Sequence, residues 1–166
     1  MTPAVPDPPS PQPPRGRLDG AEHLYPVRVY YEDTDVSGVA YHANYLRWME
    51  RARTEMLRVV GIDHAGSVAK GGGGYAVVSV ALRYRAPARL DDALTVASRL
   101  TGARMASLAI QQTVRRGAVV LAQADVVAAF VAPDGRPRRQ PPAWLAIYRG
   151  LLSPDHDGAR VPQGDA

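Results

Sequence analysis

The sequence contains no cysteine among its 166 residues. Disulfide bonds, thiolate nucleophiles and zinc or iron–sulfur sites built from cysteine are therefore excluded. No stretch approaches the ~18 consecutive apolar residues of a membrane-spanning helix. The opening residues, MTPAVPDPPSPQPPRGR, lack the apolar centre of a secretory signal. We therefore expect a cytoplasmic protein with no membrane span.

Several common catalytic motifs are also missing. The chain has neither the G-x-S-x-G elbow of serine esterases nor the glycine fingerprint of dinucleotide-binding folds. The glycines at Gly71–Gly74 are not followed by the Lys-Ser or Lys-Thr pair of a phosphate-binding loop. His23, His64 and His156 have no metal-ligand spacing. We therefore expect neither a metal nor a bound cofactor.

The chain is basic, with a formal net charge of +4 at pH 7 and a pI near 9.7. Such a charge suits an acidic partner, such as nucleic acid, anionic lipid or a phosphorylated cofactor, but an ordinary basic surface has the same signature. No basic stripe is interleaved with aromatic residues. We therefore expect no nucleic-acid binding.

Two ends of unusual composition flank one predicted domain. Residues 1–22 are rich in proline, a composition that disfavours helix and sheet and buries little apolar surface. Residues 153–166 have a similar character. We predict disordered tails at 1–22 and 153–166 and one compact domain at 23–152, which is long enough for a single hydrophobic core.

Alternation of apolar and polar residues predicts strands, and glycine or proline separates them. A first strand is expected at Val27–Tyr31, and a short closing helix at Ala143–Leu151. Between them, short connections favour antiparallel pairing of successive strands in a four-strand meander. Its strands are expected at Tyr75–Tyr84, Ala93–Thr101, Met105–Arg115 and Val119–Val131.

One long helix is predicted from Asn44 to Val60. Its apolar residues recur at steps of three and four, and Gly61 stands where a helix commonly ends. The stripe expected to be buried comprises Tyr45, Met49, Ala52, Met56 and Val60. Arg51 and Glu55, on the opposite face, are spaced to form a weak ion pair.

The chemistry is expected just ahead of this helix. Asp33 and Asp35 precede the helix start, where backbone N–H groups without intrahelical partners and the positive end of the helix dipole attract an anion or a polarised carbonyl. From the residues alone, the two carboxylates could equally serve to cap a turn or the helix.

The segment from Tyr31 to Glu55 resembles the signature of hotdog-fold acyl-CoA thioesterases, specifically the 4-hydroxybenzoyl-CoA thioesterase group and its branch associated with the bacterial Tol-Pal system. This resemblance implies an α+β hotdog fold, in which an antiparallel sheet of about five strands wraps around one long helix. The matching residues are Tyr31, Glu32, Asp33, Thr34, Asp35, Gly38, Val39, Tyr41, His42, Asn44, Tyr45, Glu50, Arg51, Ala52, Arg53, Thr54 and Glu55.

The resemblance also implies catalytic residues. Asp35 takes the position of the acidic group that attacks the thioester as a nucleophile or activates water as a general base. The backbone N–H near Tyr41 or His42 is the expected donor to the carbonyl oxygen. The His42 side chain and Tyr31 match two further site positions, although a helix-start histidine and a strand aromatic also have ordinary structural roles.

Substrate contacts are expected from the same loop and from arginines. Gly38, Val39 and Tyr41 would lie against the acyl group, with Gly38 allowing a close approach. Arg83 and Arg104 could bind the phosphates of coenzyme A, although each could also be a solvated strand-edge arginine.

The function implied is hydrolysis of an acyl-CoA to a free acid and coenzyme A by a homodimer or homotetramer. A curved sheet of this size leaves an edge and an apolar face to be covered. Two alternatives stay open: hydrolysis of acyl carrier protein thioesters, which the basic surface would suit, and a non-catalytic module that binds an acyl ligand or a partner.

Overall fold

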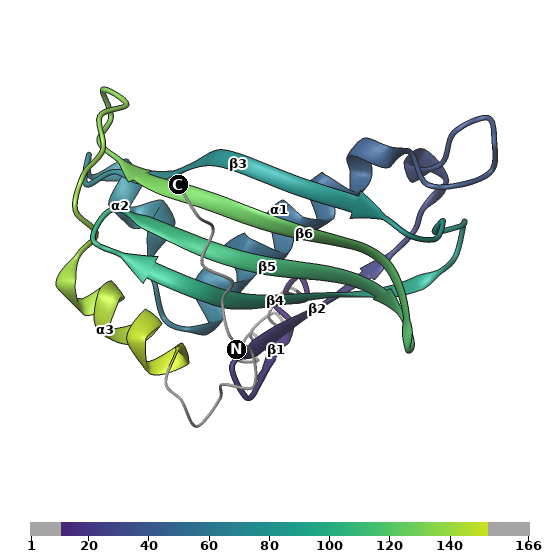
Figure 1. Ribbon diagram of the computed structural model, residues 1–166, viewed down its shortest axis with the longest axis horizontal. Coiled ribbons are helices and arrows are strands. Elements are labelled where there is room, and N and C mark those ends of the chain that lie inside the picture. Colours follow the sequence, from purple (N-terminus) through teal and green to yellow (C-terminus); the bar gives the residue numbers. More distant parts are fainter. Residues whose placement is uncertain (1–10, 153–166) are drawn as a thin grey trace, which may run out of the picture.

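The computed structural model describes residues 11–152. An antiparallel sheet of six strands, in the order β1-β2-β4-β5-β6-β3, carries the long helix α1 on one face (Figure 1). The strands are β1 Arg17–Asp19, β2 Glu22–Arg28, β3 Gly74–Tyr84, β4 Ala93–Arg104, β5 Ser107–Arg116 and β6 Val119–Val131; the helices are α1 His42–Val59, α2 His64–Ala69 and α3 Pro142–Leu151.

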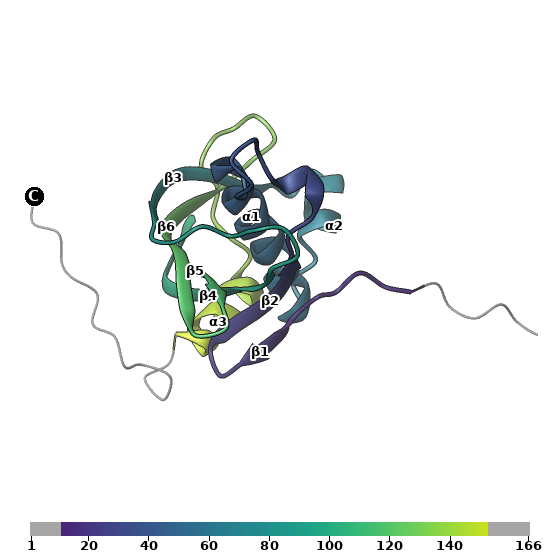
Figure 2. The ribbon, with the colours of Figure 1, turned by 90° about the vertical axis from the view of Figure 1, so that its right-hand side faces the viewer.

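The sheet curls around α1, which lies in its concave side (Figure 2). Register shifts mark bulges in β3 between Val77 and Ser79, in β4 between Leu100 and Gly102, and in β6 between Val120 and Ala122. Bulges bend a strand and increase its twist. This arrangement confirms the predicted α+β hotdog fold, with six strands instead of about five.

The periodic apolar stripe predicted for α1 is the buried stripe. Tyr45, Met49, Ala52 and Met56 are buried, and Val60 packs partly against the core. Gly61 follows the helix with a φ of +80°, a conformation that favours glycine at this position. The predicted Arg51–Glu55 pair is not formed: Glu55 pairs with Arg58.

The predicted meander is wrong for one strand. β3 pairs with β6, so it forms the free edge of the sheet instead of lying beside β4. The connection from β3 to β4 crosses the end of the curled sheet, and the Ala88 N–H donates to the Tyr45 hydroxyl of α1 at 2.8 Å. The prediction assumed that a short connection joins neighbouring strands, which holds for an open sheet. Because this sheet curls around α1, the short connection can join β3 and β4 even though they are not neighbours in the sheet.

The ordered chain begins before the predicted boundary at residue 23. Arg17–Asp19 pair with β2, and the buried His23 ring lies 2.8 Å from the Arg15 carbonyl through Nε2. The predicted tail at 1–22 is therefore structured in part, while residues 1–10 and the tail at 153–166 lie outside the described residues. β2 ends at Arg28, so Tyr31 falls in a short 3-10 turn, η1 Tyr31–Asp33, instead of in a strand.

None of the helices in residues 11–152 is long and apolar enough to cross a membrane. The far end of the domain is closed by α3, whose Tyr148 hydroxyl lies 2.8 Å from that of Tyr75 on β3. Tyr75 also bonds the buried Gln140, whose amide donates to the Arg104 carbonyl at 2.6 Å. These contacts fix α3 to the sheet.

His64 makes the stability of this end sensitive to pH. Its Nε2 accepts a hydrogen bond from the Tyr75 N–H at 3.0 Å, which requires that nitrogen to be unprotonated. Burial lowers the pKa of His64 below its usual 6.5, against a smaller opposing effect of Glu50. As the pH falls, His64 is therefore protonated at a higher pH in the unfolded chain than in the folded protein.

We predict that the free energy of unfolding falls as the pH drops below about 6.5, because the unfolded state then binds more protons at this position. Chemical denaturation above and below that pH checks this. His64→Gln keeps an acceptor for Tyr75 but does not titrate, so it should show a shallower pH dependence. Identical slopes for the two proteins would contradict the assignment to His64.

Candidate functional site

The loop between β2 and α1 folds back on itself as a small hairpin. The Asp35 N–H donates to the Val39 carbonyl at 3.0 Å, and the Tyr41 N–H donates to the Asp33 carbonyl at 2.8 Å. The Ala40 N–H donates to the Ala88 carbonyl at 2.8 Å, which fastens the hairpin to the β3–β4 connection. These hydrogen bonds fix the backbone position of Asp35 relative to the start of α1.

Gly38 closes the tip of this hairpin. Its N–H donates to the Asp35 carbonyl at 3.0 Å, and its φ is +74°. A side chain at this φ would be strained, although a Cβ there would meet no atom within 4 Å. Glycine is therefore favoured here by the conformation of the turn. No neighbouring atom in residues 11–152 comes close enough to exclude a side chain.

The Asp35 carboxylate is exposed and is held by Ser37. Its Oδ1 accepts the Ser37 N–H at 2.8 Å and also the Ser37 hydroxyl. These hydrogen bonds, the hydroxyl first, lower the pKa of Asp35, and the charge interaction with His42 adds a smaller effect. The carboxylate is therefore ionised at neutral pH, and its second oxygen has no hydrogen-bond partner among residues 11–152.

The first turn of α1 offers unpaired backbone donors. The Tyr41 and Asn44 N–H groups donate to Asp33 and Tyr41 carbonyls, and no side chain caps the helix. Within the described chain, the N–H groups of His42 and Ala43 are left without a hydrogen-bond partner. Of the two amides predicted as carbonyl donors, the one at Tyr41 is already occupied, so His42 is the available donor.

The position of this helix start is set by Asp33. Its carbonyl accepts the Tyr41 N–H and also the side-chain amide of buried Asn44, at 2.9 Å. Its carboxylate accepts the Tyr30 N–H at 2.8 Å, which closes η1. Asp33 is therefore occupied with holding the loop, whereas Asp35 points a free oxygen to solvent.

Aromatic side chains surround the helix start. The Tyr84 hydroxyl of β3 donates to the His42 carbonyl at 2.7 Å, and the His42 ring contacts the Tyr41 ring at a centroid distance of 4.3 Å. Tyr31 is 83% exposed, so it is not the core aromatic considered as an alternative. Asp35 and Tyr41 belong to the loop and His42 is the first residue of α1, while Tyr31 lies in η1 before the hairpin.

An open groove lies beside α1, beginning at Leu46 in its second turn. It lies between α1 and the edge strand β3 and has a volume of about 490 Å³. Leu46 stands one helical turn beyond His42, with Val80 and Val77 on the strand side and Glu50 and Arg53 farther along. Leu46, Val77 and Val80 give the groove an apolar surface that suits a hydrocarbon or aromatic group, and Arg47 and Arg51 add two further charged side chains to its lining.

The two arginines predicted to bind phosphates lie at opposite ends of the sheet. Arg83 stands beside Tyr84, at the end where α1 begins. Arg104 pairs with Ser107 at the other end, and the strand register separates the two rows by about 20 Å. Of the two arginines, only Arg83 lies at the end of the sheet where α1 begins.

Sequence reasoning missed Ser37 and Tyr84 as contacts of the site. Ser37 two residues after Asp35 is a recognisable side-chain turn signal. The contact of Tyr84 with His42 depends on the packing of β3 beside α1 and has no local signal. No group of three or more metal-ligating side chains is found in residues 11–152.

With this geometry established, comparisons with known proteins define the family. The family model of the thioesterase-like superfamily matches residues 29–148, which include the hairpin, α1 and most of the sheet. The chain belongs to this superfamily.

Relatives of known name agree with this assignment. The chain is 40% identical over 127 residues, 75% of its length and 94% of the relative, to a protein of Escherichia coli O6:H1 named "Acyl-CoA thioester hydrolase YbgC". The crystal structure of a probable thioesterase from Bartonella henselae has a TM-score of 0.68 and 35% identity, covering 72% of this chain and 99% of that one. The 4-hydroxybenzoyl CoA thioesterase of Pseudomonas sp. strain CBS-3 shares the fold, with a TM-score of 0.70 and 23% identity over 76% of this chain and 98% of that one.

The Asp35–Ser37 contact makes a prediction about the pKa of the carboxyl group. Ser37→Ala should raise the pKa of Asp35, because it removes the hydroxyl donor and keeps the backbone donor. A carbon-detected NMR titration of the Asp35 carboxyl measures it. Thr34→Ala serves as a control, since the Thr34 hydroxyl donates to the Tyr31 carbonyl instead. An Asp35 pKa unmoved by Ser37→Ala would show that the hydroxyl does not bond the carboxylate.

Proposed function

We propose that this protein is an acyl-CoA thioesterase, which hydrolyses a thioester to a free carboxylic acid and coenzyme A. One observation carries the proposal: an ionised carboxylate with a free oxygen and an unpaired helix N-terminal amide belong to the same short loop. Membership of the thioesterase-like superfamily and the names of the relatives support it.

The amide acts on the carbonyl oxygen of the substrate. Negative charge develops on that oxygen as the thioester is attacked, and a fixed N–H aimed at it stabilises the transition state by ~3–4 kcal/mol. The His42 N–H suits this role because the helix already holds it in place and no acceptor in residues 11–152 competes for it. The helix dipole favours negative charge at the same point.

Asp35 supplies the attack, either as a nucleophile on the carbonyl carbon or as a base that takes a proton from water. Both routes need the ionised carboxylate that the Ser37 hydrogen bonds stabilise. A carboxylate with a lowered pKa is a weaker base. The Ser37 hydrogen bonds therefore keep Asp35 ionised at neutral pH but reduce its basicity. The His42 ring and Tyr31 are proposed to position the thioester or water beside it.

The acyl group is proposed to lie in the groove between α1 and β3. Gly38, Val39 and Tyr41 would then border the reacting carbon on the loop side. The thioester at the His42 amide would direct its acyl chain past Leu46, because that residue follows His42 by one turn.

A second copy of the chain is proposed to cover β3. This edge strand of 11 residues has its backbone unpaired on one side, and Val77, Val78 and Val80 are 48%, 65% and 39% exposed. A long apolar edge of this kind is normally paired or covered. We propose a homodimer through this strand, which could assemble further into a homotetramer.

The finer assignments are also proposals. The absence of cysteine fits a cytoplasmic location, and the signature at Tyr31–Glu55 supports the Tol-Pal-associated branch. Asp35 and the His42 amide together need neither metal nor cofactor for this reaction. Exposed arginines near the site would suit an acidic acyl carrier protein as an alternative donor.

Asp35→Asn tests the proposed chemistry. The amide keeps the shape of the side chain but can neither attack as an anion nor accept a proton, so kcat should fall by about 10²–10⁴-fold. Thiol release from a panel of short, long and aromatic acyl-CoAs measures it. Asp33→Asn is the matched control and should be milder, because its oxygen holds the loop. Wild-type kcat in Asp35→Asn would refute the mechanism, and an inert wild type would favour a binding module.

The arginines test how coenzyme A is held. Arg83→Ala should raise KM for acyl-CoA with little change in kcat, because phosphates far from the reacting bond are held equally in ground and transition states. Arg104→Ala at the far end provides the comparison and should raise KM only if a partner subunit brings it to the site. An acyl-pantetheine substrate has no nucleotide phosphates and should not distinguish the variants. An equal defect on both substrates would indicate damage to the fold.

A further inference from the structure

The hydroxyl of Tyr84 bonds to a peptide group in the first turn of α1. Tyr84 is the last residue of β3, and its O–H donates to the His42 carbonyl at 2.7 Å. That carbonyl and the Ala43 N–H belong to the same peptide group, which is planar and conjugated. The Ala43 N–H has no hydrogen-bond partner in residues 11–152. A hydroxyl on the sheet is therefore linked to an available helix donor through one peptide group.

The neighbours of Tyr84 fix the direction of this hydroxyl. The Tyr84 ring meets the buried Tyr45 ring edge-on, at a centroid distance of 5.3 Å and an angle of 84°. It meets the His42 ring at 6.5 Å and 86°. Edge-to-face contacts of this kind are attractive, and pairing with Ala122 of β6 holds the Tyr84 backbone. The hydroxyl therefore reaches the His42 carbonyl from a fixed strand.

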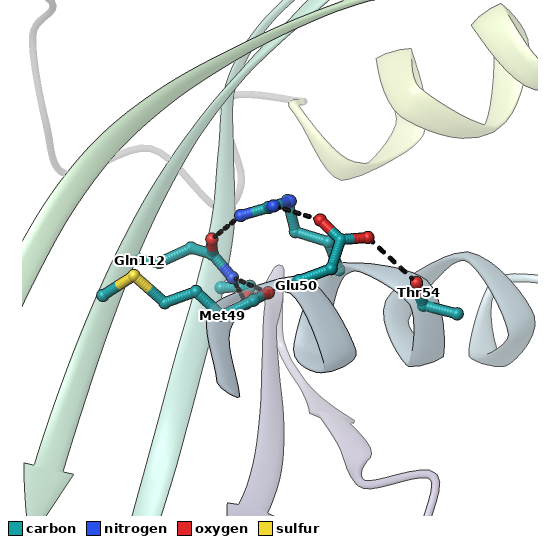
Figure 3. A network of polar contacts seen from close by, with 6 residues as sticks. Met49, Glu50, Thr54 and Gln112 are labelled. Carbon is teal, nitrogen blue, oxygen red and sulfur yellow. Dashed lines mark hydrogen bonds and ion pairs between the residues drawn. The ribbon is translucent and has the colours of Figure 1, made fainter. Parts of the chain in front are cut away.

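The helix is anchored to the sheet by other contacts. Near its middle, the Met49 carbonyl accepts a hydrogen bond from the buried Gln112 amide of β5 at 2.9 Å (Figure 3). The oxygen of the same amide accepts a hydrogen bond from Arg53 at 2.7 Å, and Arg53 forms an ion pair with Glu50. Tyr84 is 48% exposed. Loss of its hydroxyl should therefore leave the helix in place.

The Tyr84 hydrogen bond changes the strength of the Ala43 donor. A hydrogen bond to the carbonyl of a peptide group polarises that group and strengthens its N–H as a donor, by about 10–30% per bond. N–H groups of the first helical turn point toward the helix N-terminus, where the dipole favours negative charge. The Ala43 N–H is therefore suited to join the His42 N–H at an oxygen that becomes negative.

We infer that the Ala43 N–H is a second donor to the thioester oxygen and that Tyr84 is the positioning residue that polarises it. This inference rests on the proposed function, in which the His42 N–H is the first donor. Tyr84 acts through the peptide group and does not contact the substrate. Because the oxygen carries more charge in the transition state than in the substrate, a stronger donor raises kcat and changes KM little.

Tyr84→Phe removes the hydroxyl and keeps the ring. Loss of one oxyanion donor costs about 10²–10³-fold in kcat, so weakening one by a tenth to a third should lower kcat about two- to eightfold. KM should stay nearly unchanged, and the Ala43 amide proton should move upfield in a ¹⁵N-correlation spectrum. Tyr25→Phe on β2 is the matched control, because its ring packs against the same part of the core. It should change neither kcat nor the Ala43 proton.

Ala43→Pro removes the second donor itself. Proline is tolerated in the first turn of a helix, where the N–H has no intrahelical partner. This variant should lower kcat by about 10²-fold, whereas Ala43→Ser keeps the N–H and should not. If Tyr84 acts through Ala43, adding Tyr84→Phe to Ala43→Pro should lower kcat no further. Independent effects would multiply instead.

Thermal melting establishes that each variant is folded. Wild-type kcat in Tyr84→Phe, or effects that multiply in a folded double variant, would overturn the inference while leaving the thioesterase function intact. If Ala43→Pro does not fold, the kcat and the Ala43 proton shift of Tyr84→Phe decide the question alone. A wild type that hydrolyses no acyl-CoA would instead refute the proposed function.

Discussion

The hydrogen bonds that Asp33 accepts at the start of α1 are the contacts on which the rest of the site depends. One backbone carbonyl takes both the Tyr41 N–H and the Asn44 side chain, so the helix start and the loop before it have a single relative position. Because Tyr41 and Asn44 are used in this way, the backbone donors of the first turn left without a partner in residues 11–152 are those of His42 and Ala43. Which N–H is available to a ligand is therefore decided by which of its neighbours are already bonded.

The long helix α1 is itself held along the whole domain by packing into both parts of the core. Its first half packs against one part of the core through Tyr45, Trp48 and Met49, and its second half packs through Met56 and Leu57 against the part that α3 closes. One rigid element thus carries the amide at its start and the Arg53–Glu50 pair three turns later.

The sequence predicted the elements well because their signals are local. The three- and four-residue spacing of α1 and the alternation in the four later strands depend on which face each residue buries, and Gly61 and Gly117 mark real ends and turns. Strand order was not predicted correctly, because the pairing of β3 with β6 is decided by the curl of the sheet around α1. The β1 strand was missed because proline and glycine dominate its surroundings and its three residues are all exposed.

The candidate site was also predicted only where its signals are local in the sequence. Asp35, Gly38 and His42 could be found from one continuous segment, and the structure places the first two in the loop and His42 at the start of α1. The contact of Tyr84 with His42 and that of Gln112 with Met49 required three-dimensional packing, since these partners lie 42 and 63 residues apart in the chain. The choice between Tyr41 and His42 as donor required knowing which N–H is already bonded. Arg83 and Arg104 look alike in sequence but lie at opposite ends of the sheet.

The most direct measurement of the central claim observes the backbone N–H of His42 itself, which any substitution of the side chain other than proline would leave in place. A ketone analogue of an acyl-CoA, in which a methylene replaces the sulfur, keeps the carbonyl oxygen but cannot be hydrolysed. Titrated into ¹⁵N-labelled protein, it should move the His42 amide proton strongly downfield, because that N–H gains a carbonyl acceptor, while the Tyr41 amide, already bonded to Asp33, should move little. An unmoved His42 amide in a saturated complex would contradict the account.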